Sequence, residues 1–158
     1  MRVLTLIVVV LTLLVGAFFG YCYSGARMRI EAVYAQVTPA LEAQEPFAEV
    51  TGQVADGTFY GTKYREAEFL MPDSFAFLTL SVRMENRGLF PMDWIRIEVR
   101  PDAADVLQLA NDRAPSLFAG SRADFTTTLL TRLGADTTRK VIVTYYVLGR
   151  AFSAEYEM

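Results

Sequence analysis

The chain has 158 residues, enough for one domain and an additional segment. Its formal net charge is only −3 and its basic residues are scattered, which argues against a nucleic-acid partner. It contains no histidine and one cysteine, Cys22. These counts exclude His-based catalytic triads, His–metal sites, cysteine-based zinc sites and internal disulfides. We therefore expect no catalytic residue, no metal and no cofactor.

The first segment is an uncharged apolar run from Val3 to Gly20, which Tyr21, Cys22 and Tyr23 extend. Its length suits a helix that crosses the bilayer core. We predict that residues 1–23 form a transmembrane signal anchor at the cell membrane, with the rest of the chain outside the cytoplasm. An alternative interpretation is a signal peptide cleaved near Ala26, which would release a secreted protein.

Residues 24–45 have apolar side chains at helical spacing and predict a short amphipathic linker helix. The apolar stripe consists of Ile30, Val33, Tyr34, Val37 and Leu41. Pro39 is expected to kink or end the helix. The stripe is expected to pack on the following domain, to pair with a helix of a protein partner, or to lie on lipid.

Residues 46–158 change to a period of two, which is typical of half-buried strands. In the clearest segment, Leu78, Leu80, Val82 and Met84 point one way, and the residues between them point the other. Similar alternation predicts strands at residues 77–85, 94–99, 122–131, 141–147 and 152–156, with weaker ones at 48–54, 58–64 and 66–70. The alternation implies that one face of each sheet is exposed to solvent, which indicates two antiparallel sheets packed as two layers. The expected fold is an all-β immunoglobulin-like antiparallel β-sandwich.

Three motifs carry a family resemblance. VRMENRG, from Val82 to Gly88, is similar to the strand-and-turn motif of CARDB-like and fibronectin-type-III-like immunoglobulin modules on prokaryotic surfaces. FAGSRADFTTTLL, from Phe118 to Leu130, resembles their next turn and strand, and the hairpin from Tyr146 to Phe152 fits as well. The resemblance covers residues 75–158. It implies a spacer, an adhesion module or a carbohydrate-binding module.

Two apolar groups are candidate binding surfaces. The connection after the Asn86-Arg87-Gly88 turn carries Leu89, Phe90, Met92 and Trp94, which are unusual in an exposed loop. These side chains either face a protein partner or, as we favour, tuck Phe90 and Trp94 into the core. A second aromatic group is a candidate ligand site, formed by Phe59, Tyr60 and Tyr64.

Asp102, Asp105, Asn111 and Asp112 carry oxygen ligands that could hold Ca²⁺, but they match no calcium-loop spacing, and we expect them to lie in a solvated loop. The sequence thus predicts a membrane-anchored, extracytoplasmic, non-enzymatic module for protein–protein interaction or envelope assembly. Its partner surfaces are the loop residues Leu89, Phe90, Met92 and Trp94 and the stripe residues Ile30, Val33, Tyr34 and Val37. The alternative is a glycan- or ligand-binding β-sandwich that uses exposed aromatic side chains.

Overall fold

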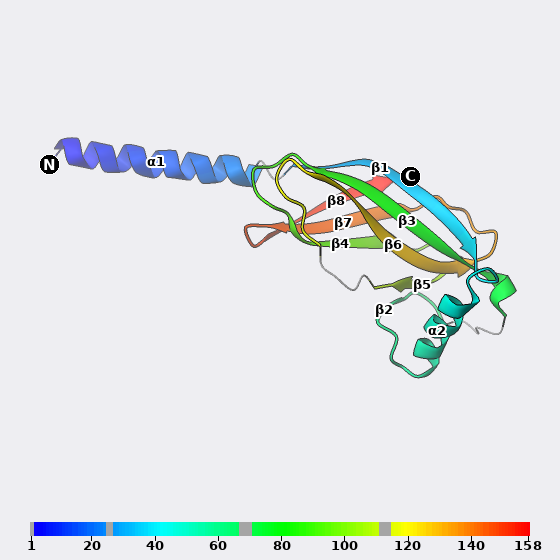
Figure 1. Ribbon diagram of the computed structural model, residues 1–158. Helices are drawn as coiled ribbons and strands as arrows, with labels where there is room; N and C mark the ends of the chain where they lie inside the picture. Colours follow the sequence, from blue (N-terminus) through cyan, green and yellow to red (C-terminus); the bar gives the residue numbers. More distant parts are fainter. Residues whose placement is uncertain (1, 25–26, 67–70, 111–114) are drawn as a thin grey trace.

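The computed structural model describes residues 2–24, 27–66, 71–110 and 115–158, and it consists of one apolar helix followed by a mostly β domain (Figure 1). The helix is α1 (Arg2–Ser24). The domain contains, in chain order, β1 (Met28–Pro39), α2 (Gln44–Ala55), β2 (Gly61–Lys63), the short 3-10 turn η1 (Pro72–Ser74), β3 (Phe75–Asn86), β4 (Asp93–Arg100), β5 (Asp105–Leu109), β6 (Arg122–Arg132), β7 (Lys140–Val147) and β8 (Arg150–Glu157).

The strands form two antiparallel sheets that share one core. The larger sheet has the order β1-β3-β6-β5-β2 and the smaller sheet the order β4-β7-β8. Their facing rows of side chains make a single buried cluster with contributions from β3, β4, β6 and β7. The prediction of two antiparallel sheets is therefore confirmed. The inward row of β3 is also as predicted, because Leu78, Leu80, Val82 and Met84 are all buried.

The prediction of a linker helix at residues 24–45 is wrong. Residues 28–39 form β1, which pairs with β3 through eleven residue pairs and lies at the edge of the larger sheet. The register shifts at Glu31, between Ile30 and Ala32, as at a β-bulge. The shift places Ile30 and Val33 opposite the inward residues Met84 and Val82. Two apolar residues three apart therefore share a face of this strand, a spacing that resembles a helix.

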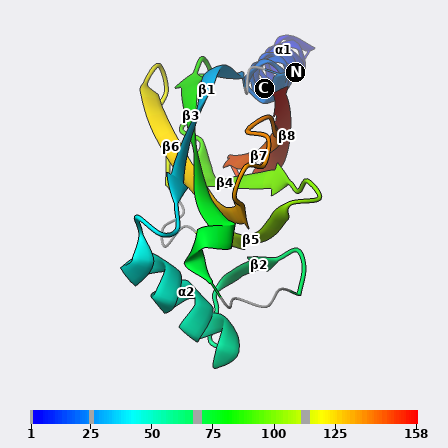
Figure 2. The same cartoon turned by 90° about the vertical axis from the view of Figure 1, so that its right-hand side faces the viewer.

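The weak strand predicted at residues 48–54 is also wrong, because these residues belong to α2. Phe47 and Val50 lie one helical turn apart and are both buried. They pack on the outer face of β3, where the rings of Phe47 and Phe75 have centroids 5.7 Å apart. Figures 1 and 2 place α2 at the end of the domain opposite α1. The strand predicted at residues 66–70 falls mostly outside the described residues.

The expectation of a solvated loop is wrong at Asp105, which is buried at the start of β5, whereas Asp102 is exposed outside the strand. Asn111 and Asp112 lie outside the described residues. Asp105 and Arg139 form a buried two-bond ion pair, in which Nε and Nη2 donate to the carboxylate at 2.8 and 2.9 Å. Their side chains are 0% and 2% exposed. Burial by itself raises the pKa of the Asp105 carboxyl, but the hydrogen bonds from Arg139 and the Asp102 amide outweigh burial, so that pKa lies below its usual value. The pair holds the start of β5 against the connection that leads into β7.

Candidate functional site

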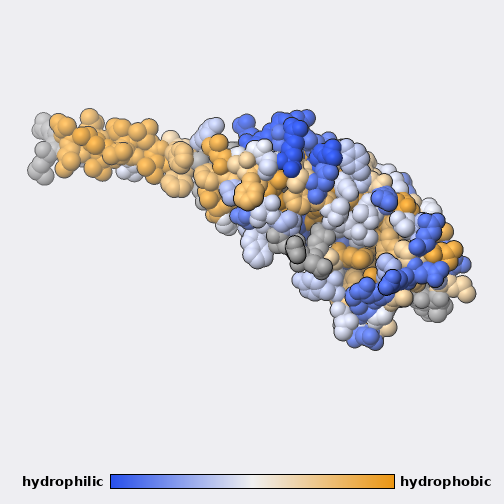
Figure 3. All heavy atoms as spheres, in the orientation of Figure 1, coloured by the Kyte–Doolittle hydropathy of each residue, from blue (hydrophilic) through white to orange (hydrophobic). Residues whose placement is uncertain are grey.

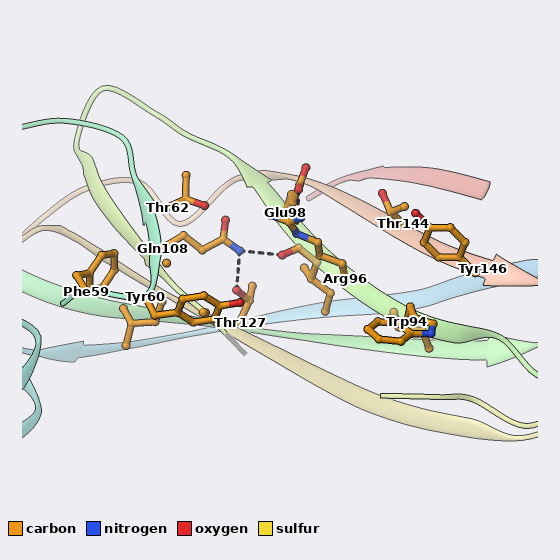
Figure 4. A pocket seen from close by; sticks show the side chains of 15 residues that line it. Phe59, Tyr60, Thr62, Trp94, Arg96, Glu98, Gln108, Thr127, Thr144 and Tyr146 are labelled. Atoms are coloured by element: carbon orange, nitrogen blue, oxygen red, sulfur yellow. Dashed lines mark hydrogen bonds and ion pairs between the residues drawn. The ribbon is translucent and has the colours of Figure 1, made fainter. Parts of the chain in front are cut away.

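A groove of about 620 Å³ lies where β4 of the smaller sheet faces β2 and β5 of the larger sheet (Figure 4). Four aromatic side chains contribute to its lining, namely Phe59, Tyr60, Trp94 and Tyr146. Its volume is within the range of small-ligand sites in proteins. The groove brings together residues from both candidate surfaces of the sequence analysis. Phe59 and Tyr60 come from the aromatic group, and Trp94 comes from the apolar connection after the Asn86-Arg87-Gly88 turn.

Trp94 stands in the groove because β4 is irregular at its first residues. The pairing of β4 with β7 shifts register between Asp93 and Arg96, and Trp94 has a φ of 53°. A positive φ is rare for a bulky residue and costs conformational energy. The Trp94 side chain is 69% exposed, so the expectation that it tucks into the core is wrong. Residues with strained backbone cluster at functional sites, which makes the exposed Trp94 a candidate binding residue.

The opposite wall is formed by the chain that leads into β2. Tyr60 is 80% exposed, and the half-buried Phe59 packs partly on the cluster below α2. Gly61 permits this arrangement, because a Cβ there would overlap the Gln108 carbonyl oxygen and lie 2.6 Å from Cζ of Phe59. The Phe59 ring is therefore held over a backbone position that only glycine fits.

The floor of the groove is closed by the side-chain amide of Gln108, from β5. Its Nε2 donates to the Ile97 carbonyl and to the Thr127 hydroxyl, both at 2.8 Å. Its Oε1 accepts from the Val99 amide at 3.2 Å and from the Tyr64 hydroxyl at 2.6 Å. All four hydrogen-bonding positions of this amide are occupied. The outer edge of β4 is thus closed to strand addition between Ile97 and Val99.

The hydrogen bonds of Gln108 to Ile97 and Val99 form a seam between β5 and β4. Tyr64 strengthens this seam, because its hydroxyl also lies 2.9 Å from the Val99 carbonyl. Desolvation, with the nearby charges of Asp105 and Glu98, raises the pKa of Tyr64 to about 12. Tyr64 is half-buried and faces the core, so it is not part of the exposed aromatic lining.

We expect Tyr64→Phe to lower the free energy of unfolding at pH 7 by about 1–2 kcal/mol, because a hydrogen-bonded hydroxyl between the sheets is lost. Because the folded state raises the pKa of Tyr64 from 10.0 to about 12, folding favours the neutral phenol. The contribution of the Tyr64 hydroxyl to stability is therefore fully present below pH 10.0 and is lost as pH rises towards 12. The stability difference between wild type and variant should therefore shrink over that interval.

Urea unfolding at pH 7 and at several alkaline values measures this difference. Tyr60→Phe is the matched control, because the exposed Tyr60 should contribute no stability through its hydroxyl. Equal stability of Tyr64→Phe and wild type at pH 7 would contradict the bonding across the seam.

Charged groups at the mouth of the groove come from β4. Arg96 Nε lies 3.1 Å from the Glu98 carboxylate, and both side chains are exposed. An exposed ion pair of this kind contributes little stability, so both groups are available to a bound molecule. Among the described residues that line the groove, Glu98 is the only carboxylate. The described part of the chain also contains no cluster of three or more potential metal-binding His, Cys, Asp or Glu residues.

The other predicted loop residues do not share the groove. Met92 is fully buried and exchanges backbone hydrogen bonds with Leu117 at 2.8 and 2.9 Å, so it offers no surface to a partner. Phe90 packs partly against the main core, whereas Leu89 is exposed. The buried Asn86 organises this loop, since its Nδ2 donates to the Phe90 and Leu117 carbonyls, both at 2.9 Å.

The predicted stripe is divided between the two faces of β1. Ile30, Val33 and Val37 lie opposite inward residues of β3, whereas Tyr34 lies on the other face, opposite Ser81. Ile30 and Val33 pack partly on the core, while Tyr34 and Val37 are exposed. The outer edges of β1 and β8 have no strand neighbour within the described residues. These two edges, unlike that of β4, remain open to a partner strand.

No family model matches the chain, and no curated protein matches its sequence significantly. The site therefore has to be interpreted from its own geometry. Sequence reasoning missed Arg96, Gln108 and Tyr146, which the structure brings to the groove. The only signal for Gln108 was its place between Leu107 and Leu109, which is the alternation of a strand.

Proposed function

We propose that this chain is a non-enzymatic binding module that α1 fixes to the cell membrane, with its β domain outside the cytoplasm. The helix supports this proposal, since Val3–Tyr21 is long and apolar enough to cross a membrane and its most apolar window is not buried within the described part of the chain. A signal sequence has the same features, so retention of α1 is part of the proposal. We also propose that the two sheets form an immunoglobulin-like sandwich, because three sequence motifs resemble those of immunoglobulin-like modules.

The groove is the recognition surface in this proposal, and a protein is its partner. The observation that carries it is the pair of exposed aromatic side chains, Trp94 and Tyr60, on opposite walls with Arg96 at the mouth. Trp, Tyr and Arg are the residue types that dominate the energetics of protein interfaces. Because Gln108 closes the edge of β4, the groove recognises its partner through side chains and not through an added strand.

We expect a photoreactive phenylalanine analogue in place of Tyr60 to form one discrete crosslinked product in the native membrane. Trp94→Ala in the same chain should abolish that product. A central interface tryptophan contributes about 2 kcal/mol or more, which corresponds to a loss of affinity of about 30-fold. The Trp94 side chain is exposed, so its removal should leave the fold intact.

The matched control places the same analogue at Tyr34, which is also exposed but lies on β1. A product from position 34 alone would move the partner surface to the open edge of β1 and contradict the groove. A product at position 60 that survives Trp94→Ala would also contradict it.

A glycan is the second candidate for the same groove, because flat aromatic faces also stack on sugar rings. The test uses the fact that Trp94 is the only tryptophan of the chain, so its fluorescence reports directly on the groove. A saturable change in emission with soluble oligosaccharides, without any crosslinked protein, would favour the glycan. Turnover of a small substrate would contradict the non-enzymatic proposal as a whole.

A further inference from the structure

Three loop tips gather at the end of the β domain from which α1 leaves (Figure 1). They are the loop between β3 and β4, the turn before β6, and the hairpin turn between β7 and β8. The Arg87 amide donates to the Arg27 carbonyl at 2.9 Å, which ties this end to the chain just after α1. Ser24 and Arg27 are three residues apart, a reach of about 11 Å at most. A membrane crossed by α1 therefore lies directly beside these tips.

Each tip exposes a large apolar side chain. Leu89 is 60% exposed, Phe118 is 72% exposed and Leu148 is 49% exposed. Figure 3 shows hydrophobic side chains over the end of the domain that adjoins α1. Exposed tips of loops in water usually carry small or polar residues. Three large apolar side chains at one end of a domain indicate a contact surface.

The hairpin tip is unusual in its backbone as well. Leu148 has a φ of 50° and Gly149 a φ of 78°. Two successive positive φ values are typical of a type I′ turn, in which Asn, Asp or Gly is preferred at both central positions. A leucine there is conformationally costly, and the turn itself gives no reason for it.

Hydrogen bonds fix two of these tips relative to each other. The Asn86 amide donates to the Ser121 carbonyl at 3.0 Å, and the Gly120 amide donates to the Asn86 carbonyl at 2.8 Å. The Asn86 side chain also binds the Leu117 carbonyl. The loop that carries Leu89 and the turn that carries Phe118 are therefore held together as one surface.

The positions of charged residues also favour contact between this end of the domain and a membrane. Arg27, Arg87 and Arg150 lie at the end beside α1. In contrast, residues 30–62, which include α2 at the opposite end, contain no Lys or Arg. The acidic residues of that segment beyond β1 are Glu42, Glu45, Glu49 and Asp56. Anionic lipid headgroups attract these arginine side chains and repel the acidic side chains of α2 and its flanking residues.

We propose that Leu89, Phe118 and Leu148 insert into the interfacial layer of the same bilayer that α1 crosses. The inserted tips hold the domain with α2 away from the membrane, so the groove is kept at a fixed height above the bilayer. This inference rests on the membrane anchoring in the proposed function and is independent of what the groove binds.

The test uses the full chain with Cys22→Ser and a single new cysteine, Phe118→Cys, labelled with a polarity-sensitive dye. The protein is reconstituted into vesicles of phosphatidylcholine and phosphatidylglycerol, without any other protein. We expect dye emission to shift to shorter wavelength and to be quenched by lipids that carry a spin label near the headgroup. Asp56→Cys, in the turn after α2, is the matched control and should show neither effect.

A second variant adds Leu89→Ser and Leu148→Ser to the chain labelled at residue 118. Loss of the two neighbouring tips should reduce both the wavelength shift and the quenching. Protein that floats with the vesicles while the dye at residue 118 behaves as in water would overturn the inference and leave the anchor standing. Protein that fails to float would contradict the anchor itself, and with it the inference.

Discussion

A chain that begins at Pro46 should fail to fold, whereas a chain that begins at Arg27 should fold as the complete β domain. The difference between the two is β1, which pairs with β3 through eleven residue pairs. Its loss removes a ladder of hydrogen bonds that contribute about 0.5–1.5 kcal/mol each. It also uncovers the part of the core on which Ile30 and Val33 pack.

These losses are as large as the whole stability of a small domain, which is about 5–15 kcal/mol. Removal of β1 also leaves the long β3 as an exposed edge, which promotes aggregation. Circular dichroism and urea unfolding of both chains measure the effect, and α1 is absent from both. Cooperative unfolding of the shorter chain at the same urea concentration as the longer one would show that β1 is dispensable.

Regular alternation allowed five strands to be predicted from the sequence. The segments around Leu80, Ile97, Thr127, Val143 and Ala154 all form strands close to the expected limits. In these segments most inward residues are apolar and most outward residues are polar, so the period of two is directly visible. The apolar N-terminal helix was predictable for a similar reason, since its composition is uniform over its length.

The remaining elements were missed where local pattern and tertiary context disagree. The register shift at Glu31 gives β1 an apolar spacing that resembles a helix. The start of β5 contains Asp105, whose burial depends on a distant partner, Arg139. The α2 segment has an apolar spacing of three, from Phe47 to Val50, but Pro46 lies in its first turn and made a helix less evident.

The groove was only partly predictable, because it is formed between sheets. The aromatic side chains at Phe59, Tyr60 and Trp94 drew attention as residue types. Their meeting depends on the irregular start of β4 and on the bonds of Gln108 across the seam. Neither feature has a local signature in a single sequence, so the candidate site required the structure.

Leu80→Asp should unfold the domain, whereas Thr79→Asp, at the adjacent position, should be tolerated. Leu80 is fully buried in the middle of β3, between the two sheets. An unpaired carboxylate there costs several kcal/mol in lost solvation, in addition to the lost packing of the leucine. The sum is comparable with the total stability of the domain.

Thr79 is the matched control, because successive side chains of a strand point to opposite faces. It is half-buried on the outer face of the larger sheet, where its hydroxyl lies 3.2 Å from that of Thr128. Aspartate at this position loses one hydroxyl contact of about 1 kcal/mol but keeps access to water. Thermal unfolding of the two variants measures the contrast, and similar melting temperatures would mean that the inward face of β3 is assigned to the wrong residues.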